Sequence, residues 1–171
     1  MKYSFVKLST KYKDALVDMM DEWTKTNEKI VPYAIGCADY HDFSTYLTRI
    51  NEENPVPNFV PSSTFFCMDN DTGEFVGAAN IRHILNEPLL LTGGHIGDGV
   101  RPSRRGQGIG TILVTLALEE CDTLGIDPVL MTCDKSNIAS ARTIQKNGGV
   151  LENEVLEEGE WVQRYWIKRG E

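Results

Sequence analysis

A glycine-rich stretch constrains the fold of this chain more than any other feature. Residues 94–110 read GHIGDGVRPSRRGQGIG. Apolar residues then recur at helical spacing, and they are Ile109, Ile112, Leu113, Leu116, Ala117, Cys121 and Leu124. The pattern predicts a strand that runs through a glycine-rich turn into a helix docked on the core. Because the first N–H groups of a helix lack internal partners and its dipole places positive charge there, we expect an anion-binding site at this turn.

Two other glycine-rich motifs do not fit this turn. A Walker loop requires Gly-Lys-Ser/Thr, which the sequence lacks. A dinucleotide fingerprint requires Gly-x-Gly-x-x-Gly/Ala directly after a strand. Its third position would be Thr111 for a motif starting at Gly106, and Leu113 for one starting at Gly108. Asp134 could imitate the acidic residue that binds ribose, so the exclusion depends on the glycine spacing.

The turn resembles the signature of one superfamily. Arg105-Gly106-Gln107-Gly108-Ile109-Gly110 fits the Arg/Gln-x-x-Gly-x-Gly/Ala pattern of the GNAT superfamily of acyl-CoA-dependent N-acetyltransferases. The likeness covers essentially the whole chain and is strongest over residues 65–149. It implies an α/β (α+β) fold in one domain, residues 1–171, with a mixed, mostly antiparallel central sheet of about six to seven strands and about four helices.

Size and composition are those of an ordinary globular protein, and the net charge limits its partners. The chain has 171 residues, of which 41% are hydrophobic, and this suits one core. Its formal net charge of -8 argues against a nucleic-acid partner. The N-terminus is not a signal peptide and no apolar run approaches the roughly 20 residues of a membrane span, so we expect a cytoplasmic protein without membrane contact.

The four cysteines are predicted to be reduced core thiols. They form no Cys-x-x-Cys pair, and Cys67, Cys121 and Cys133 lie within apolar stretches. We therefore expect no metal site and no cysteine nucleophile.

Periodicity and turn residues predict the remaining elements. Strands are expected over residues 3–8, 63–69, 74–84, 92–100, 128–133, 150–156 and 161–168. Helices are expected over residues 11–25, 42–51 and 136–146, besides the helix that follows the glycine-rich turn. The strand-helix-strand order across residues 92–133 predicts a parallel pair joined by a crossover.

The resemblance implies that coenzyme A is held by the turn and its surroundings. The implied contacts are Gly99, Val100, Arg104, Arg105, Gly106, Gln107, Gly108, Ile109, Gly110, Thr111, Asn137 and Ser140. In an acidic chain, the cluster of Arg101, Arg104 and Arg105 is better explained by phosphates than by a solvated loop. Asn137 could equally be a plain helix start.

Direct attack by an amine on the thioester, as the family uses, requires a proton acceptor. The candidates are His95 and Asp98, and we favour His95 because an ordinary imidazole titrates near pH 6.5. A histidine satisfied by structural hydrogen bonds is the equal alternative. The family's usual tyrosine acid is replaced here by Ile144, and Tyr165 is the candidate substitute.

The sequence says least about the pocket that binds the acceptor amine. The family implies that residues 27–43 and 51–61 enclose it, which makes Trp23, Glu28, Tyr33 and Tyr40 candidate substrate contacts, although aromatic residues near helix ends often belong to the core. Acidic residues near the last hairpin could attract a cationic acceptor or form a solvated edge.

Three functions follow from these observations. The first is an acetyl-CoA-dependent N-acetyltransferase that acts on a small amine or a peptide amine, and the resemblance allows a homodimer. The second is a non-catalytic acyl-CoA sensor with the same fold, which the replacement at Ile144 suggests. The third is an enzyme with a nucleotide cofactor, against which the glycine spacing argues.

Overall fold

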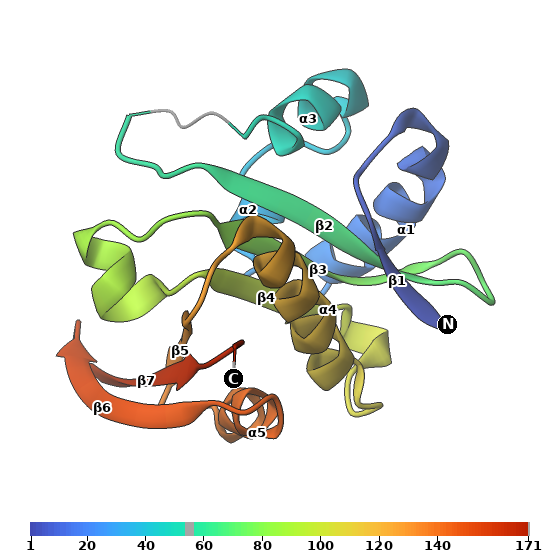
Figure 1. Cartoon of the computed structure of the whole chain (residues 1–171). Coiled ribbons are helices and arrows are strands. Elements are labelled where there is room, and N and C mark those ends of the chain that lie inside the picture. Colours follow the sequence, from blue (N-terminus) through green and yellow to red (C-terminus); the bar gives the residue numbers. More distant parts are fainter. Residues whose placement is uncertain (54–56, 171) are drawn as a thin grey trace.

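The computed structural model describes residues 1–53 and 57–170, and its strands form two antiparallel sheets (Figure 1). The first sheet has the order β1 (Tyr3–Val6), β2 (Ser62–Asp69), β3 (Phe75–Arg82), β4 (Ile96–Val100). The second has the order β5 (Val129–Asp134), β7 (Glu160–Ile167), β6 (Val150–Glu157). The α/β, mostly antiparallel architecture predicted from the sequence is confirmed. Residues 54–56 of the predicted pocket segment 51–61 lie outside the described residues.

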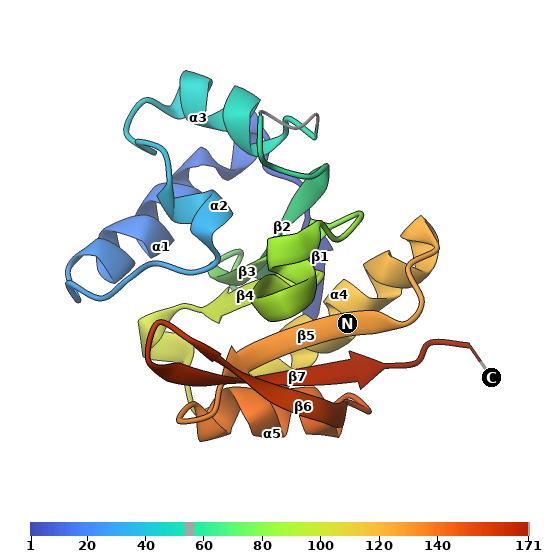
Figure 2. The ribbon, with the colours of Figure 1, turned by 90° about the vertical axis from the view of Figure 1, so that its left-hand side faces the viewer.

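Helices cover both faces of the first sheet (Figure 2). The N-terminal helices α1 (Lys13–Thr24), α2 (Tyr33–Gly36) and α3 (Phe43–Ile50) lie on one face. Helix α4 (Ile109–Leu124) packs on the opposite face, and α5 (Ile138–Lys146) packs beside α4 and against β5. Short helical turns occur at Thr10–Tyr12, Leu89–Gly93 and Pro102–Arg104. None of the helices in the described part of the chain is long and apolar enough to cross a membrane.

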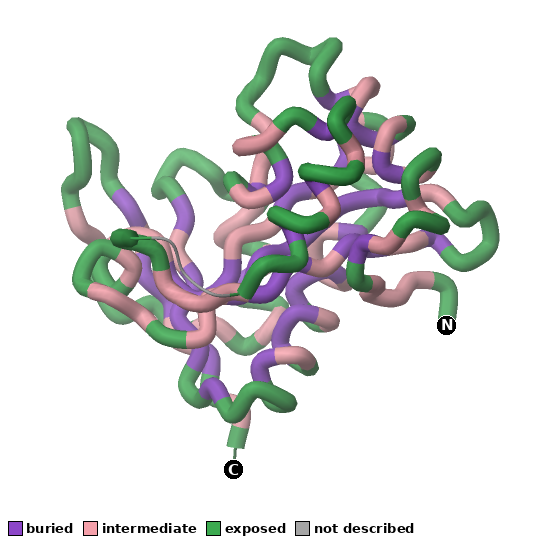
Figure 3. Tube along the Cα trace, turned by 90° about the horizontal axis from the view of Figure 1, so that it is seen from above, coloured by how far each residue is buried: buried purple, intermediate pink, exposed green. Residues whose placement is uncertain are grey.

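Two apolar clusters separated by the first sheet form the core, and the burial pattern is visible along the trace (Figure 3). Leu16 and Trp23 of α1 belong to one cluster, and Leu113 of α4 belongs to the other. Strand β3 contributes to both, because Ala78 faces α1 while Ala79 faces α4. Full burial of one such leucine stabilises the fold by about 1.5–3 kcal/mol. This double burial explains why β3 is apolar nearly throughout.

The strand predicted for residues 92–100 is shorter than expected. It begins only at Ile96, because Leu89–Gly93 forms a π-helical turn that ends at Gly94 with a φ of 69°. The Arg82 guanidinium holds this turn through Nη1, which donates to the carbonyl oxygens of Gly93 at 3.1 Å and Gly94 at 3.2 Å. Arg82 thereby fixes where β4 starts.

The predicted parallel strand pair is wrong in its hydrogen bonding. The His95 N–H donates to the Leu130 carbonyl at 2.8 Å, and the Leu130 N–H donates to His95 Nδ1 at 2.9 Å. Beyond this pair, no hydrogen bond joins β4 to β5 in the described residues, so the strands belong to different sheets. The imidazole takes the N–H that a parallel ladder would have used. We call the region where the two strands part after His95 and Leu130 the β4–β5 divergence.

Candidate functional site

The divergence opens toward the carboxyl ends of β4 and β5, where two helices begin. Strand β4 leads into the glycine-rich turn and α4, while β5 leads through Asn137 into α5. The first turn of α4 lies against both neighbours, since a Cβ on Gly110 would stand 3.7 Å from Thr143 Oγ1 and from Val100. Carboxyl ends of strands are where ligands bind in open α/β sheets.

Backbone donors of β4 face the divergence. Arg82 N–H donates to the His95 carbonyl and Arg101 N–H donates to the Val76 carbonyl, so odd-numbered residues from 95 to 101 bond to β3. The alternation directs the N–H groups of Asp98 and Val100 the other way, toward β5. The N–H of Gly99 itself belongs to the ladder with β3, and a cofactor contact near Gly99 stays a prediction.

The glycine-rich turn presents a row of free backbone donors, which we call the cradle (residues 106–111). Within residues 1–53 and 57–170, no partner accepts a hydrogen bond from any of these six N–H groups. Gly106 and Gly108 have φ of 74° and 78°, values that side chains disfavour, and a Cβ on either would meet nothing within 4 Å. The cradle therefore combines unpaired donors, a helix N-terminus and open space, the features of an anion site.

The arginines beside the cradle donate hydrogen bonds to carboxylates of the protein itself. Arg101 Nε donates to Glu22 at 2.6 Å and Nη2 donates to Asp18 at 2.8 Å, which ties the turn to α1. Arg104 donates to Asp69 at 2.8 Å and to Glu74 at 3.0 Å, which ties it to the β2–β3 turn. Its hydrogen bond holds the pKa of the Asp69 carboxyl below its usual value. Arg104 thus fixes the loop through these ion pairs, and its expected phosphate contact stays a prediction.

Arg105 forms an ion pair with Glu28, and Glu28 in turn contacts Trp23. Glu28 and Trp23 are two of the predicted substrate contacts. Its Nη1 donates to Glu28 at 3.2 Å and its Nε donates to the Val100 carbonyl at 3.2 Å. Glu28 also accepts from the indole of Trp23, which is fully buried in the core. Trp23 is a fully buried core residue, which corrects its expected contact with an acceptor, whereas Glu28 is exposed and its contact with an acceptor stays a prediction. Tyr40 likewise donates its hydroxyl to Asp21.

At the start of α5, Asn137 is a helix cap. Its side chain accepts a hydrogen bond from the Ser140 N–H at 3.1 Å, which supports the plain helix-start interpretation. The Ser140 side chain hydrogen-bonds the Cys133 thiol and partly offsets the burial that raises its pKa. The contact of Asn137 and Ser140 with the cofactor, which the resemblance implied, stays a prediction.

His95 is placed for a structural role. It is buried, its Nδ1 accepts from Leu130, and burial lowers its pKa to about 4. A neutral ring with an occupied Nδ1 fits the alternative of a satisfied histidine better than a proton acceptor. Sequence reasoning missed this because the partner is a backbone N–H on a strand 35 residues away.

Asp98 has the properties that the sequence suggested for His95. It lies on β4 between Gly97 and Gly99 and is partly buried. Burial raises the pKa of its carboxyl to about 6, while the positive charge of Arg82 opposes the rise. A carboxylate with this pKa is suited to accept protons near neutral pH. Its side chain lies on the α4 face of the first sheet, because its strand partner Ala79 packs there, and Cys133 of β5 belongs to the same cluster.

Tyr165 of β7 and Ile144 of α5 are buried in the same apolar cluster. Tyr165 is 2% exposed, burial raises its pKa, and its hydroxyl donates to Gln163 Oε1 at 2.9 Å. Ile144 is fully buried in the core. The position of the family's usual tyrosine therefore carries a packing residue, and the candidate substitute already donates its proton within the protein.

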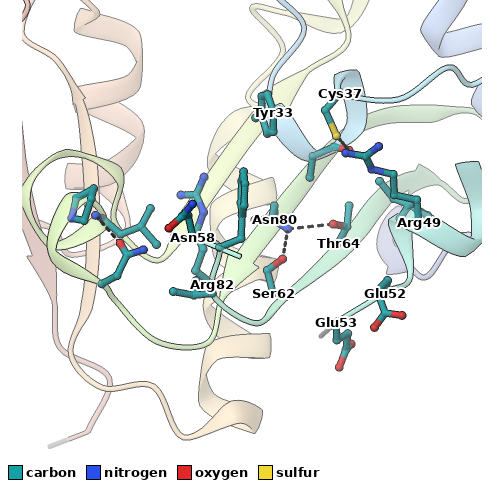
Figure 4. A pocket seen from close by; sticks show the side chains of 17 residues that line it. Tyr33, Cys37, Arg49, Glu52, Glu53, Asn58, Ser62, Thr64, Asn80 and Arg82 are labelled. Atoms are coloured by element: carbon teal, nitrogen blue, oxygen red, sulfur yellow. Dashed lines mark hydrogen bonds between the residues drawn. The ribbon is translucent and has the colours of Figure 1, made fainter. Parts of the chain in front are cut away.

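On the α2–α3 side of the sheet lies a pocket of about 670 Å³ (Figure 4), which we call the Asn80 pocket. It is lined by α2, α3, the segment that follows α3, β2, β3 and the turn before β4. Of the predicted contacts it includes Tyr33. Sequence reasoning missed Asn80 and Arg82, although two polar residues at alternate positions of an apolar strand were a usable signal.

The described residues give little support for a cysteine nucleophile or a metal site. All four cysteines are free, and burial raises the pKa of Cys67 and of Cys121 to about 12. Across residues 1–53 and 57–170, no group of three or more His, Cys, Asp and Glu side chains could hold a metal ion.

A cradle of backbone donors at a helix N-terminus, beside a strand divergence and with a pocket across the sheet, has the features of a protein that binds an anionic ligand. The sequence profile of the Acetyltransferase (GNAT) family matches residues 17–149. The chain belongs to this family. A search of curated protein sequences finds no match.

Solved structures share the fold over nearly their whole length. A ribosomal-protein-S5-alanine acetyltransferase from Vibrio fischeri has a TM-score of 0.72 at 15% identity, covering 98% of this chain and 93% of that one. A chimera of the Vibrio cholerae spermidine N-acetyltransferase SpeG and hSSAT has a TM-score of 0.66 at 16% identity, covering 98% and 96%. RimL, a ribosomal L7/L12 α-N-protein acetyltransferase in complex with coenzyme A, has a TM-score of 0.68 at 15% identity, covering 98% and 94%.

Proposed function

We propose that this protein transfers the acetyl group of acetyl-CoA to a primary amine. The observation that carries the proposal is the row of unpaired N–H groups in the cradle, with open space beside Gly106 and Gly108. Such a row suits the phosphates of coenzyme A, because it adds several donors to the partial positive charge of a helix end. The fold shared with RimL, which is in complex with coenzyme A, supports the same donor.

The backbone of β4 would position the reacting thioester. Acetyl-CoA, when bound, supplies an acetyl carbon that the amine nitrogen can attack. The N–H groups of Asp98 and Val100 face the divergence and would donate to the pantetheine arm and the thioester oxygen. Fixed donors of this kind are worth roughly 3 kcal/mol each in measured oxyanion holes.

Asp98 is the proton acceptor in this proposal. A C–N bond forms and the C–S bond breaks, so the amine nitrogen loses one proton and the departing sulfur gains one. The Asp98 side chain lies on the α4 face of β4 and the Asn80 pocket lies on the other face, so the Asp98 carboxylate takes the amine proton through water in the divergence. His95 holds β4 to β5 and keeps Asp98 in place. The thiol needs little help to leave, since its ordinary pKa is about 8.5.

Thiol release from acetyl-CoA tests the proposal across a panel of small amines and peptides with free amino termini. We expect release that depends on both acetyl-CoA and an amine, and an equimolar N-acetylated product detected by mass spectrometry. Calorimetry with acetyl-CoA runs in parallel. Binding without release for any amine would favour the acyl-CoA sensor, and the absence of binding would refute both functions.

A further inference from the structure

Arg82 places a positive charge at the end of the Asn80 pocket nearest β4. Its Nη1 is used on the carbonyls of Gly93 and Gly94. Its Nη2 lies over β4, 3.1 Å from where a Cβ of Gly97 would stand. Among the described residues, no acceptor pairs with Nε or Nη2, so the three N–H donors on these two nitrogens of a fixed guanidinium remain for a ligand.

Asn80 places an acceptor beside this charge. Its Nδ2 donates to Ser62 Oγ at 3.1 Å and to Thr64 Oγ1 at 3.0 Å, which fixes the orientation of the amide. The Oδ1 atom accepts no hydrogen bond from a described residue, and no fully covered side-chain atom among them lacks a partner. Oδ1 therefore reaches the pocket. Asn80 and Arg82 are two positions apart on β3, so their side chains lie on the same face.

The acidic residues of the pocket lie at its other end. In Figure 4, Glu52 and Glu53 lie with Arg49, away from Arg82 and Asn58. Glu53 is already engaged, since it accepts from Lys7 and from Ser63 at 3.0 Å each. The end next to β4 is therefore positive, which favours an anionic group there and disfavours a polycation.

The walls between the two ends are mainly apolar. The rings of Tyr33 and Phe59 stack with centroids 6.4 Å apart, and Val60 and Leu89 add aliphatic surface. An occupant therefore buries a hydrocarbon or aromatic group between them.

We propose that the acceptor is a free α-amino acid with an apolar side chain, an inference that rests on the proposed acetyl transfer. Arg82 binds its carboxylate, and Asn80 Oδ1 accepts from its amine. The two protein groups are neighbours, as are the amine and carboxylate of an α-amino acid. Arg82 lies over Gly97, next to the Asp98 N–H that faces the divergence, so this pose brings the amine to the thioester. A peptide amino terminus and a polyamine both lack the α-carboxylate.

Calorimetry on the full chain saturated with coenzyme A tests the inference. The probes are leucine, methionine and phenylalanine, each paired with its carboxamide, and spermidine. We expect each acid to bind about 10- to 100-fold more tightly than its amide, because a charge-assisted pair to Arg82 is lost. For the Arg82→Gln variant, the Kd values of each acid and its carboxamide should agree within about threefold. The Arg169→Gln variant, which removes a remote arginine paired with Asp122, should keep the preference.

Circular dichroism establishes whether the Arg82→Gln variant folds. If it does not, Asn80→Asp replaces it, because a negative charge beside Arg82 should abolish the preference while the guanidinium stays. Equal binding of acids and amides, tighter binding of spermidine, or no saturable binding of any acid would overturn the inference.

Thiol release measured with the same panel distinguishes failure of this inference from failure of the proposed function. Release with amides or spermidine but not with acids would overturn the inference alone. Release with no amine of any class would remove the proposed function.

Discussion

The cradle and the Asn80 pocket are built in different ways. The cradle is one continuous run of backbone whose donors are N–H groups, and Arg101 and Arg104 only hold it in place. The pocket is assembled from side chains of segments far apart in the sequence, such as Tyr33 and Arg82. A backbone site accepts any ligand with the same phosphates, whereas a side-chain site changes with each substitution. The difference suggests a shared donor at one end and a chain-specific acceptor at the other.

The largest expected effect is at Asp98, between the two regions. Asp98→Asn should lower kcat/KM about 10²- to 10⁴-fold while leaving the Kd of acetyl-CoA within about threefold, because it removes a proton acceptor and keeps the shape. The ratio of wild-type to variant rates should fall as the pH drops through about 6, where the carboxylate protonates. Steady-state kinetics against pH check this. A ratio near one at pH 8 would remove Asp98 from the chemistry.

The next largest effect should be a loss of acetyl-CoA binding when the cradle, and not the pocket, is changed. Gly108→Val should raise the Kd of acetyl-CoA at least about 100-fold, because a side chain there displaces phosphates from several N–H groups. Gly159→Val is the matched control, since Gly159 has a φ of 84° with no atom within 4 Å but lies in the β6–β7 turn. Calorimetry with acetyl-CoA measures both variants. An equal loss in both would mean that backbone strain, and not the cradle, causes it.

His95 and Asp98 should have opposite effects on stability in acid. The pKa of His95 is lowered to about 4 from 6.5, so its contribution is present above pH 6.5 and is lost as the pH falls toward 4. The pKa of Asp98 is raised to about 6 from 3.8, so its contribution is present below pH 3.8 and is lost as the pH rises through 6. Each amounts to about 3 kcal/mol, and in the wild type they largely cancel.

Single variants should expose the two contributions. Between pH 7 and pH 4, Asp98→Asn should lose up to about 3 kcal/mol of unfolding free energy relative to wild type, and His95→Asn should gain a similar amount. Asparagine is chosen at position 95 because its Oδ1 can still accept from the Leu130 N–H. Urea unfolding at several pH values measures both. Parallel pH curves for the two variants would contradict the assigned burial.

The smallest effect concerns the arginines that hold the cradle. Arg104→Gln should cost about 1–3 kcal/mol of unfolding free energy, because it leaves the buried Asp69 carboxylate short of a partner. The Kd of acetyl-CoA should stay within about threefold. Urea unfolding and calorimetry check the two values. A large loss of acetyl-CoA binding at unchanged stability would mean that Arg104 contacts the phosphates of coenzyme A.

Much of the fold and the cradle could be predicted from the sequence. Residues 106–111 carry their function in the backbone, and glycine spacing before a helical pattern reports backbone conformation directly. The β2–β3 hairpin and α4 were predicted for the same reason, since turn residues and apolar spacing are local signals.

The rest depended on contacts between distant segments. The role of His95 is set by Leu130, the partners of Arg104 come from the β2–β3 turn, and Arg82 is positioned by the turn before β4. Such partners leave no local pattern. The ion pairs of Arg101 and Arg104 could not be predicted, because charge in the sequence does not reveal which carboxylates will neutralise it.

The central claim is that backbone N–H groups, and not arginine side chains, hold the donor. Proton–nitrogen correlation NMR during a titration with coenzyme A tests it most directly. The account predicts large shifts for the amides of residues 106–111 and for Asp98 and Val100, with the side-chain Nε–H of Arg101 unchanged. Shifts confined to arginine side chains, or amides of residues 106–111 that do not move at saturation, would contradict it.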